Sequence, residues 1–116
     1  MFIPQLEASK DPKKKIDFAN VQRAWWDAII LTYANSGDAP MRMPLEMRIM
    51  ADSNVIMAPQ RGNNYGTCAI EILTLQANAE EFGWSVFAQK VLDKWMSYRD
   101  ANGKLLKTRP HWAKEW

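Results

Sequence analysis

The chain is short of the residues that most often mark a chemical site on their own. It has one cysteine, Cys68, and one histidine, His111, among 116 residues. A single cysteine cannot form an internal disulfide, and one Cys with one His is too few for a structural zinc site, so we expect no metal. Cys68 lies in an apolar run, which predicts a buried, unreactive thiol. The sequence therefore excludes a disulfide-stabilised secreted scaffold and a zinc module.

Long hydrophobic runs and a strong charge imbalance are also missing. The amino-terminal residues lack the apolar core of a signal peptide, and no run is long enough to cross a bilayer. A net charge of +2 is too small for a dedicated nucleic-acid binder, and we interpret the lysines at 13–15 as the solvated approach to a helix. These absences predict a soluble, cytoplasmic chain without nucleic-acid partners. They leave open that a parent enzyme associates with an organellar membrane.

What the chain does contain is a large share of apolar and aromatic residues. Apolar residues make up 47% of the chain and charged residues 24%, which is typical of a single globular domain of this length. Six tryptophans are many for 116 residues. Either they fill a core, or some of them cover a surface that another domain or a ligand occupies.

Two segments have the hydrophobic period of amphipathic helices. Over residues 18–34, apolar side chains recur every three or four positions, and Asp17 is suited to cap the start of this helix. Residues 79–99 carry a second such stripe. Its members are Trp84, Phe87, Val91, Trp95 and Tyr98.

Two further segments have the patterns of strands. Residues 41–50 alternate apolar and polar side chains, which predicts a strand with one core face and one polar face. Pro44 cannot donate a backbone hydrogen bond, so this strand should begin at an edge or a bulge. Residues 67–75 are apolar and β-branched enough for a central strand.

The resulting fold class is α+β, with a small antiparallel sheet flanked by two amphipathic helices. We interpret residues 1–15 as an irregular lead-in and residues 16–116 as a single domain. A sheet of two main strands is thin, which suggests that the chain belonged to something larger.

The clearest candidate for chemistry is the pair Glu46 and Arg48. Side chains two positions apart in a strand project from the same face, so these two should stand side by side. The simpler interpretation is an exposed ion pair worth about 0–1 kcal/mol. The functional interpretation is a polar pair facing an enclosed site, where the guanidinium holds a substrate oxygen and the carboxylate orients a hydroxyl or accepts its proton.

Four other residues have similarly divided interpretations. Lys114 lies between two tryptophans that could direct its ammonium inward, although a lysine near a chain end is usually solvated. His111 is a possible general base or a hydrogen-bonded structural group. Glu71 is a candidate for the polar face of Glu46, but the sequence does not fix the phase of the two strands. Tyr65 lies on a loop, where it either contacts a ligand or decorates a turn.

Several of these residues belong to short motifs that resemble a known family. The motifs are Pro-Leu-Glu-Met-Arg at 44–48, Asp52 with Met-Ala-Pro at 57–59, and Arg-Pro-His-Trp-Ala-Lys at 109–114. In order and spacing they resemble the C-terminal region of sugar-1,4-lactone oxidases, over about residues 40–116. This family includes L-gulonolactone, D-arabinono-1,4-lactone and L-galactonolactone oxidoreductases and the related alditol oxidases. All are flavoproteins of the vanillyl-alcohol-oxidase type.

The resemblance implies a fold and a function. It implies part of a flavoenzyme cap domain, with Glu46, Arg48 and Lys114 as catalytic, substrate-holding residues and with His111 as a further substrate-binding residue beside Trp112. The chemistry implied is hydride transfer from a CH–OH group of a sugar lactone or polyol to FAD. The family's long FAD-binding domain has no counterpart here, and the five glycines are too scattered for a phosphate-binding loop.

Three functional hypotheses follow. In the first, the chain is the substrate-side part of such an oxidoreductase, completed by a separate FAD-binding domain or chain, or assembled as a homo-oligomer. In the second, it is a stand-alone domain that binds a small ligand or a protein and has lost redox chemistry. In the third, it is a cofactor-free enzyme that uses the same polar residues for acid–base work, although their spacing selects no reaction.

Overall fold

A computed structural model of the chain describes residues 1–8, 15–38, 41, 43–81 and 83–112. The strands are β1 (Phe2–Pro4), β2 (Leu6–Glu7), β3 (Ile16–Asp17), β4 (Glu46–Met50) and β5 (Thr67–Glu71), and the helices are α1 (Ala19–Ala34), the short 3-10 helix η1 (Ser36–Asp38), α2 (Gln76–Glu81) and α3 (Trp84–Met96). The α+β class is confirmed. Among the described residues, no helix is both long and apolar enough to cross a membrane.

The main sheet has three antiparallel strands in the order β1-β5-β4, and β2 pairs with β3 in a separate two-stranded ribbon. The central position expected for the strand that begins at Thr67 is confirmed, since β5 pairs on both sides. Pro44 precedes β4, which is an edge strand of the described sheet, as expected from the missing proline N–H.

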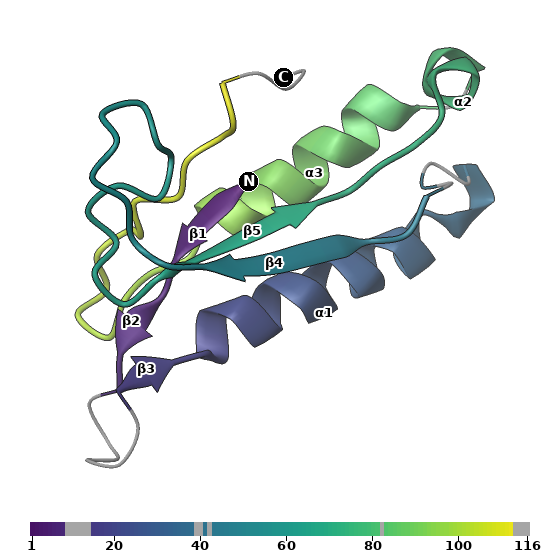
Figure 1. Ribbon diagram of the computed structural model, residues 1–116. Coiled ribbons are helices and arrows are strands. Elements are labelled where there is room, and N and C mark those ends of the chain that lie inside the picture. The colour runs from purple at the N-terminus through teal and green to yellow at the C-terminus, as the bar shows by residue number, and fades with distance from the viewer. Residues whose placement is uncertain (9–14, 39–40, 42, 82, 113–116) are drawn as a thin grey trace.

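The two long helices, α1 and α3, cover one face of this sheet (Figure 1). Cys68 and Ile70 project from β5 into the core on that face and are buried. The core also takes side chains from β1, from α1 and from α3. Its buried members are Met1, Ile3, Val21, Ala24, Ala28, Cys68, Ile70, Phe87, Val91, Trp95 and Tyr98. The opposite face of the sheet is turned away from both long helices.

The two long helices are held together by a buried hydrogen bond. The indole Nε1 of Trp95 donates to the backbone oxygen of Ala24 at 3.0 Å. At the start of α1, the Asp17 carboxylate accepts the backbone N–H of Ala19 at 2.8 Å, although Asp17 is not the N-cap residue that the sequence predicted. The backbone cap position itself belongs to Phe18, one residue later than predicted.

Three expectations differ from the structure. The lead-in of residues 1–15 contains β1 and β2, and Ile3 is fully buried. The single helix expected over 79–99 is divided into α2 and α3, because the chain turns at Gly83. Both main strands are shorter than predicted. The apolar stripe predicted for this helical region is correct in phase, since Phe87, Val91 and Trp95 are buried.

The described part of the tail runs beside β1. Phe2 and Arg109 exchange backbone hydrogen bonds of 2.7 and 2.9 Å, which extends the sheet at this edge by one bridge. The Arg109 guanidinium donates to the backbone oxygens of Pro59 and Arg61, each at 3.2 Å. The tail therefore ties the loop between β4 and β5 to the β1 edge.

Candidate functional site

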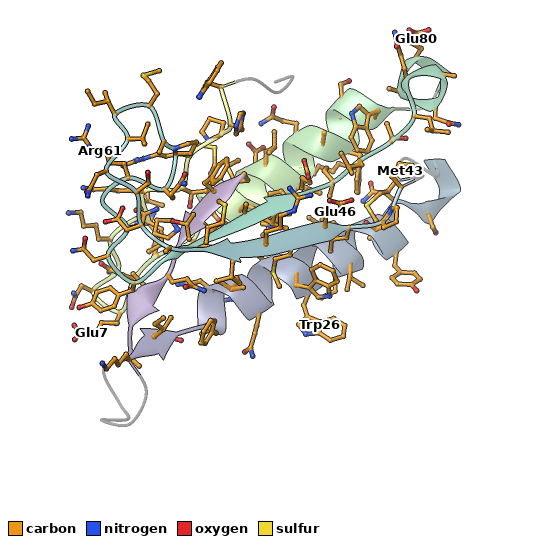
Figure 2. The ribbon with its side chains drawn as sticks, in the orientation of Figure 1. Glu7, Trp26, Met43, Glu46, Arg61 and Glu80 are labelled. Atoms are coloured by element: carbon orange, nitrogen blue, oxygen red, sulfur yellow. The ribbon has the colours of Figure 1, made fainter. Side chains whose placement is uncertain are left out.

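The predicted pair Glu46 and Arg48 lies on the face of the sheet that the long helices leave uncovered. Strand alternation sets their side chains on the opposite face from Met47, and the guanidinium of Arg48 donates to the Glu46 carboxylate at 3.1 Å. The side chains are 72% and 44% exposed for Arg48 and Glu46. The two groups thus stand side by side as expected, on a face that is open to solvent rather than enclosed. Figure 2 shows Glu46 on the near side of the sheet.

The register of the sheet fixes the phase of Glu71, which the sequence left undetermined. Glu71 is the direct partner of Glu46 across the β4–β5 pair. Residues directly opposite each other project from the same face, so two carboxylates and one guanidinium gather here. Glu71 has further interactions of its own. A substrate on this face would meet one strong donor group and two acceptors.

A cross-strand row connects this cluster to the tail. Arg48 is opposite Ala69, and Ala69 is opposite Phe2 on β1, so all three project from the face that the long helices leave uncovered, here called the open face. This face is exposed at β4, whereas Phe2 at its β1 end is buried. The Phe2 ring packs on the imidazole of His111, with ring centroids 5.5 Å apart. Two strand spacings separate Arg48 from Phe2, a backbone distance of about 10 Å. His111 therefore lies over the β1 end of the face that carries Glu46 and Arg48.

His111 is held by aromatic contacts on two sides. Besides Phe2, it stacks on Trp112, with centroids 5.6 Å apart and ring planes 20° from parallel. The indole of Trp112 is itself exposed. These ring contacts show how the imidazole is positioned, and its substrate-binding role stays a prediction.

Lys114, the third predicted catalytic residue, lies outside the described residues. The expectation that its ammonium meets Glu46 and Arg48 therefore stays a prediction. Phe2 is the residue that sequence reasoning missed. The Phe2 ring packs against His111 on the open face. The signal that could have identified Phe2 is the run of three apolar residues at positions 1–3, which is too short to predict a strand by itself.

Tyr65 and Cys68 both have structural contacts, and a ligand contact of Tyr65 stays a prediction. A hydrogen bond from Tyr65 to Glu7 raises the pKa of the phenol, and burial adds to this effect. Burial also raises the pKa of the Cys68 thiol to about 11, so the neutral thiol is strongly favoured near neutral pH. The buried position expected for Cys68 is confirmed.

A concave region lies on the helix side of the molecule, away from the Glu46–Arg48 pair. It is an open depression of about 560 Å³ beside the carboxyl end of α3. Its lining residues are Arg23, Asp27, Lys94, Ser97, Tyr98, Arg99 and Asp100. The Tyr98 hydroxyl donates to Asp27 at 2.8 Å, and burial together with this bond raises the pKa of Tyr98. Asp27 also forms a 3.9 Å ion pair with Lys94 of α3. These contacts join α1 to α3 and to the segment just after it, so we assign the region a structural role.

Comparison of the chain with protein-family models, with curated proteins and with solved structures gives no match. The functional interpretation therefore depends on the geometry of the open face and on the sequence motifs. Among the described residues, no group of three or more histidine, cysteine or acidic side chains could hold a metal ion.

Proposed function

We propose that the chain is the substrate-side domain of an FAD-dependent oxidoreductase that acts on a CH–OH group of a sugar 1,4-lactone or a polyol. The observation that carries the proposal is the shared face of Glu46, Arg48, Glu71 and His111. Glu46, Arg48 and His111 belong to the motifs that resemble the lactone oxidases. The histidine is more than sixty residues away from the other two in the sequence.

The chemistry of this face suits a polyhydroxylated ligand. The Arg48 guanidinium presents several fixed donors to the oxygens of a lactone or polyol, and Glu46 holds that guanidinium in place. The Glu71 carboxylate, opposite Glu46, is an additional acceptor for substrate hydroxyl groups. A carboxylate beside the reacting hydroxyl can also accept its proton. Lys114 completes the predicted set from the tail.

The residues on this face do not fit FAD by themselves. The ion pair is open to solvent, and the glycines of the chain form no phosphate-binding cluster. We therefore assign FAD binding to a separate domain or chain that would cover the open face. The exposed indole of Trp112 lies at the border of this face, next to His111, where such a partner would make contact.

The substrate part of the proposal is tested by titrating the full, isotope-labelled chain with D-arabinono-1,4-lactone and following backbone amide signals by NMR. We expect the largest shifts at Glu46, Arg48 and Glu71. Arg48→Gln removes a charge-assisted donor and should weaken binding roughly tenfold or more. Arg99→Gln is the matched control, since it removes the same charge at the helix-side depression. Lactone shifts elsewhere, or equal binding by both variants, would contradict the proposal.

The FAD part needs a separate measurement. Tagged wild-type chain is recovered from the cells that produce it naturally, and the visible absorption spectrum of the recovered material is recorded. A flavin spectrum that accompanies the wild type, and oxidation of the lactone by the same material, are the expected results. Material without flavin would contradict an oxidoreductase partner.

The second candidate function is a stand-alone domain that binds a small polar ligand. The exposure of the Glu46–Arg48 pair favours it, since an open face is accessible to a ligand without any partner. The two experiments separate the candidates, because lactone binding without a flavin partner is the result that this function predicts.

A further inference from the structure

Within the described part of the chain, the outer edge of β4 is an unpaired strand edge. No other described strand pairs with it, although β4 pairs with β5 along its full length. The hydrogen-bond pattern of β5 determines which N–H and C=O groups of β4 point outward. The N–H of Ile70 donates to Met1 on the β1 side, so Ala69 and Glu71 exchange hydrogen bonds with β4. The N–H and C=O groups of Met47 and Ile49 consequently point away from β5.

The charge pattern of β4 is self-complementary in one antiparallel register. A second β4 can pair with the first only where outward-facing groups meet outward-facing groups. If the pairing is centred on Met47, Glu46 of one copy lies opposite Arg48 of the other, and the reverse holds by symmetry. These are non-hydrogen-bonded positions, where opposing Cα atoms come within about 4.5 Å.

The neighbouring registers of this strand pair are electrostatically unfavourable, because each brings like charges opposite each other. Pairing centred on Arg48 sets the two Arg48 side chains opposite each other, and pairing centred on Glu46 does the same to the two carboxylates. Pairing centred on Ile49 brings Glu46 opposite Asp52. Like charges directly opposite each other destabilise a strand pair.

A strand edge alone is a small contact, since stable interfaces bury about 800 Å² on each partner. The exposed flank of α1 supplies the rest. Asp27 faces α3 through Tyr98 and Lys94, and Trp26 and Tyr33 lie about 100–120° from it around the helix. Both are largely exposed, at 61% and 77%. Figure 2 shows Trp26 projecting from α1 away from α3.

We propose that two copies of this chain associate through β4, antiparallel and centred on Met47, into one continuous six-stranded sheet. The two-fold axis is perpendicular to the sheet, so the helices of both copies lie on the same face and their α1 flanks meet. The open faces remain on the other side, next to each other. This proposal does not rest on the proposed function, because it uses the strand edge and the α1 flank rather than ligand contacts.

The charge register is tested by light scattering on the full chain over a range of concentrations. Wild type should dimerise, whereas Glu46→Arg and Arg48→Glu should each raise the dissociation constant about tenfold or more. Mixing these two variants should restore association, because each cross-strand pair is then Arg with Glu. Mixing does not restore the ion pair within either chain, so a folding defect cannot mimic the result. Glu80→Arg and Lys104→Glu are charge-matched controls away from β4 and should dimerise as wild type.

The register is read independently by cross-linking under oxidising conditions. Met47→Cys should form an intermolecular disulfide, since residue 47 lies opposite itself and the Cα atoms of such pairs are about 5.5 Å apart. Ile49→Cys should not, because its partner is Leu45 and the two copies of residue 49 are about 13 Å apart. A monomeric wild type, variants that fail to rescue each other, or cross-linking through residue 49 in place of 47 would each overturn the proposal. Recovery of an unrelated protein on this edge, with the wild type monomeric, would do so as well.

Discussion

The two strands that flank β5 differ in how well they bury the same type of side chain. Ile3 on β1 and Ile49 on β4 both lie opposite Cys68 and project from the same face of the sheet. Ile3 is 0% exposed and Ile49 is 50% exposed. The difference arises from what lies beyond each strand. The tail bridges β1 through Arg109, whereas the described residues leave the outer edge of β4 without a neighbour.

This contrast shows how burial in a small sheet depends on both neighbours of a strand. A residue on the helix side of an edge strand is covered by the helix below and the strand inside, but not from the outside. Unprotected edges invite further pairing, and folded proteins usually block or use them. The β1 edge is blocked by the chain itself, whereas no described residue pairs with the outer edge of β4.

The largest expected effect comes from truncating the two isoleucines separately. Ile3→Ala removes fully buried carbons and should lower the free energy of unfolding by about 2–5 kcal/mol. Ile49→Ala, opposite the same cysteine, should cost about 1 kcal/mol or less, because half of that side chain is already in water. Urea denaturation at concentrations where the chain is monomeric measures both. Ile3→Val, with an expected cost of about 0.5–1.5 kcal/mol, keeps the test informative if Ile3→Ala does not fold. Equal costs at the two sites would break the comparison.

An intermediate effect is expected at the cysteine that both isoleucines flank. Burial raises the pKa of Cys68 from its ordinary value of 9.0 to about 11, so the folded state favours the neutral thiol. Its contribution to stability is therefore complete below about pH 9 and is lost as the pH rises toward 11. The loss is about 2–3 kcal/mol for a shift of this size.

The contribution of Cys68 is isolated by comparison with Cys68→Ala. Both proteins should lose stability at high pH, since the raised pKa of Tyr98 acts in each of them. Wild type should lose more between pH 9 and 11, and the difference belongs to the thiol. Parallel stability curves, measured by urea denaturation at each pH, would show that Cys68 is not held in a dry environment between the two isoleucines.

The sequence was sufficient for the parts of the fold that are long and periodic. The helix predicted over 18–34 corresponds to α1, and the strand that begins at Thr67 is central as expected. It was insufficient for β1, which has three residues, ends in Pro4 and pairs with a strand about 65 positions away. Such a short strand is specified by its partner and not by its own pattern.

For the candidate site, local spacing was informative and distant geometry was not. The two-residue spacing of Glu46 and Arg48 correctly predicted a pair on one face. The position of Glu71 required the register between β4 and β5, which depends on the length and path of the intervening loop. The place of His111 required β1, because Phe2 is the ring on which it packs.

The smallest effect is expected on the β4 side, at the ion pair itself. Glu46→Gln, Arg48→Gln and the double variant form a cycle whose coupling energy should be about 0–1 kcal/mol and should decrease with added salt. Both side chains are substantially solvated, so neither the desolvation cost nor the attraction is large. The cycle is measured by urea denaturation at low and high ionic strength, with the monomeric chain. A coupling well above 1 kcal/mol that persists in salt would mean that something shields the pair from water. In that case the face with Glu46 and Arg48 would be shielded from water. The contrast between β1 and β4 would then be limited to the burial of their isoleucines, Ile3 and Ile49.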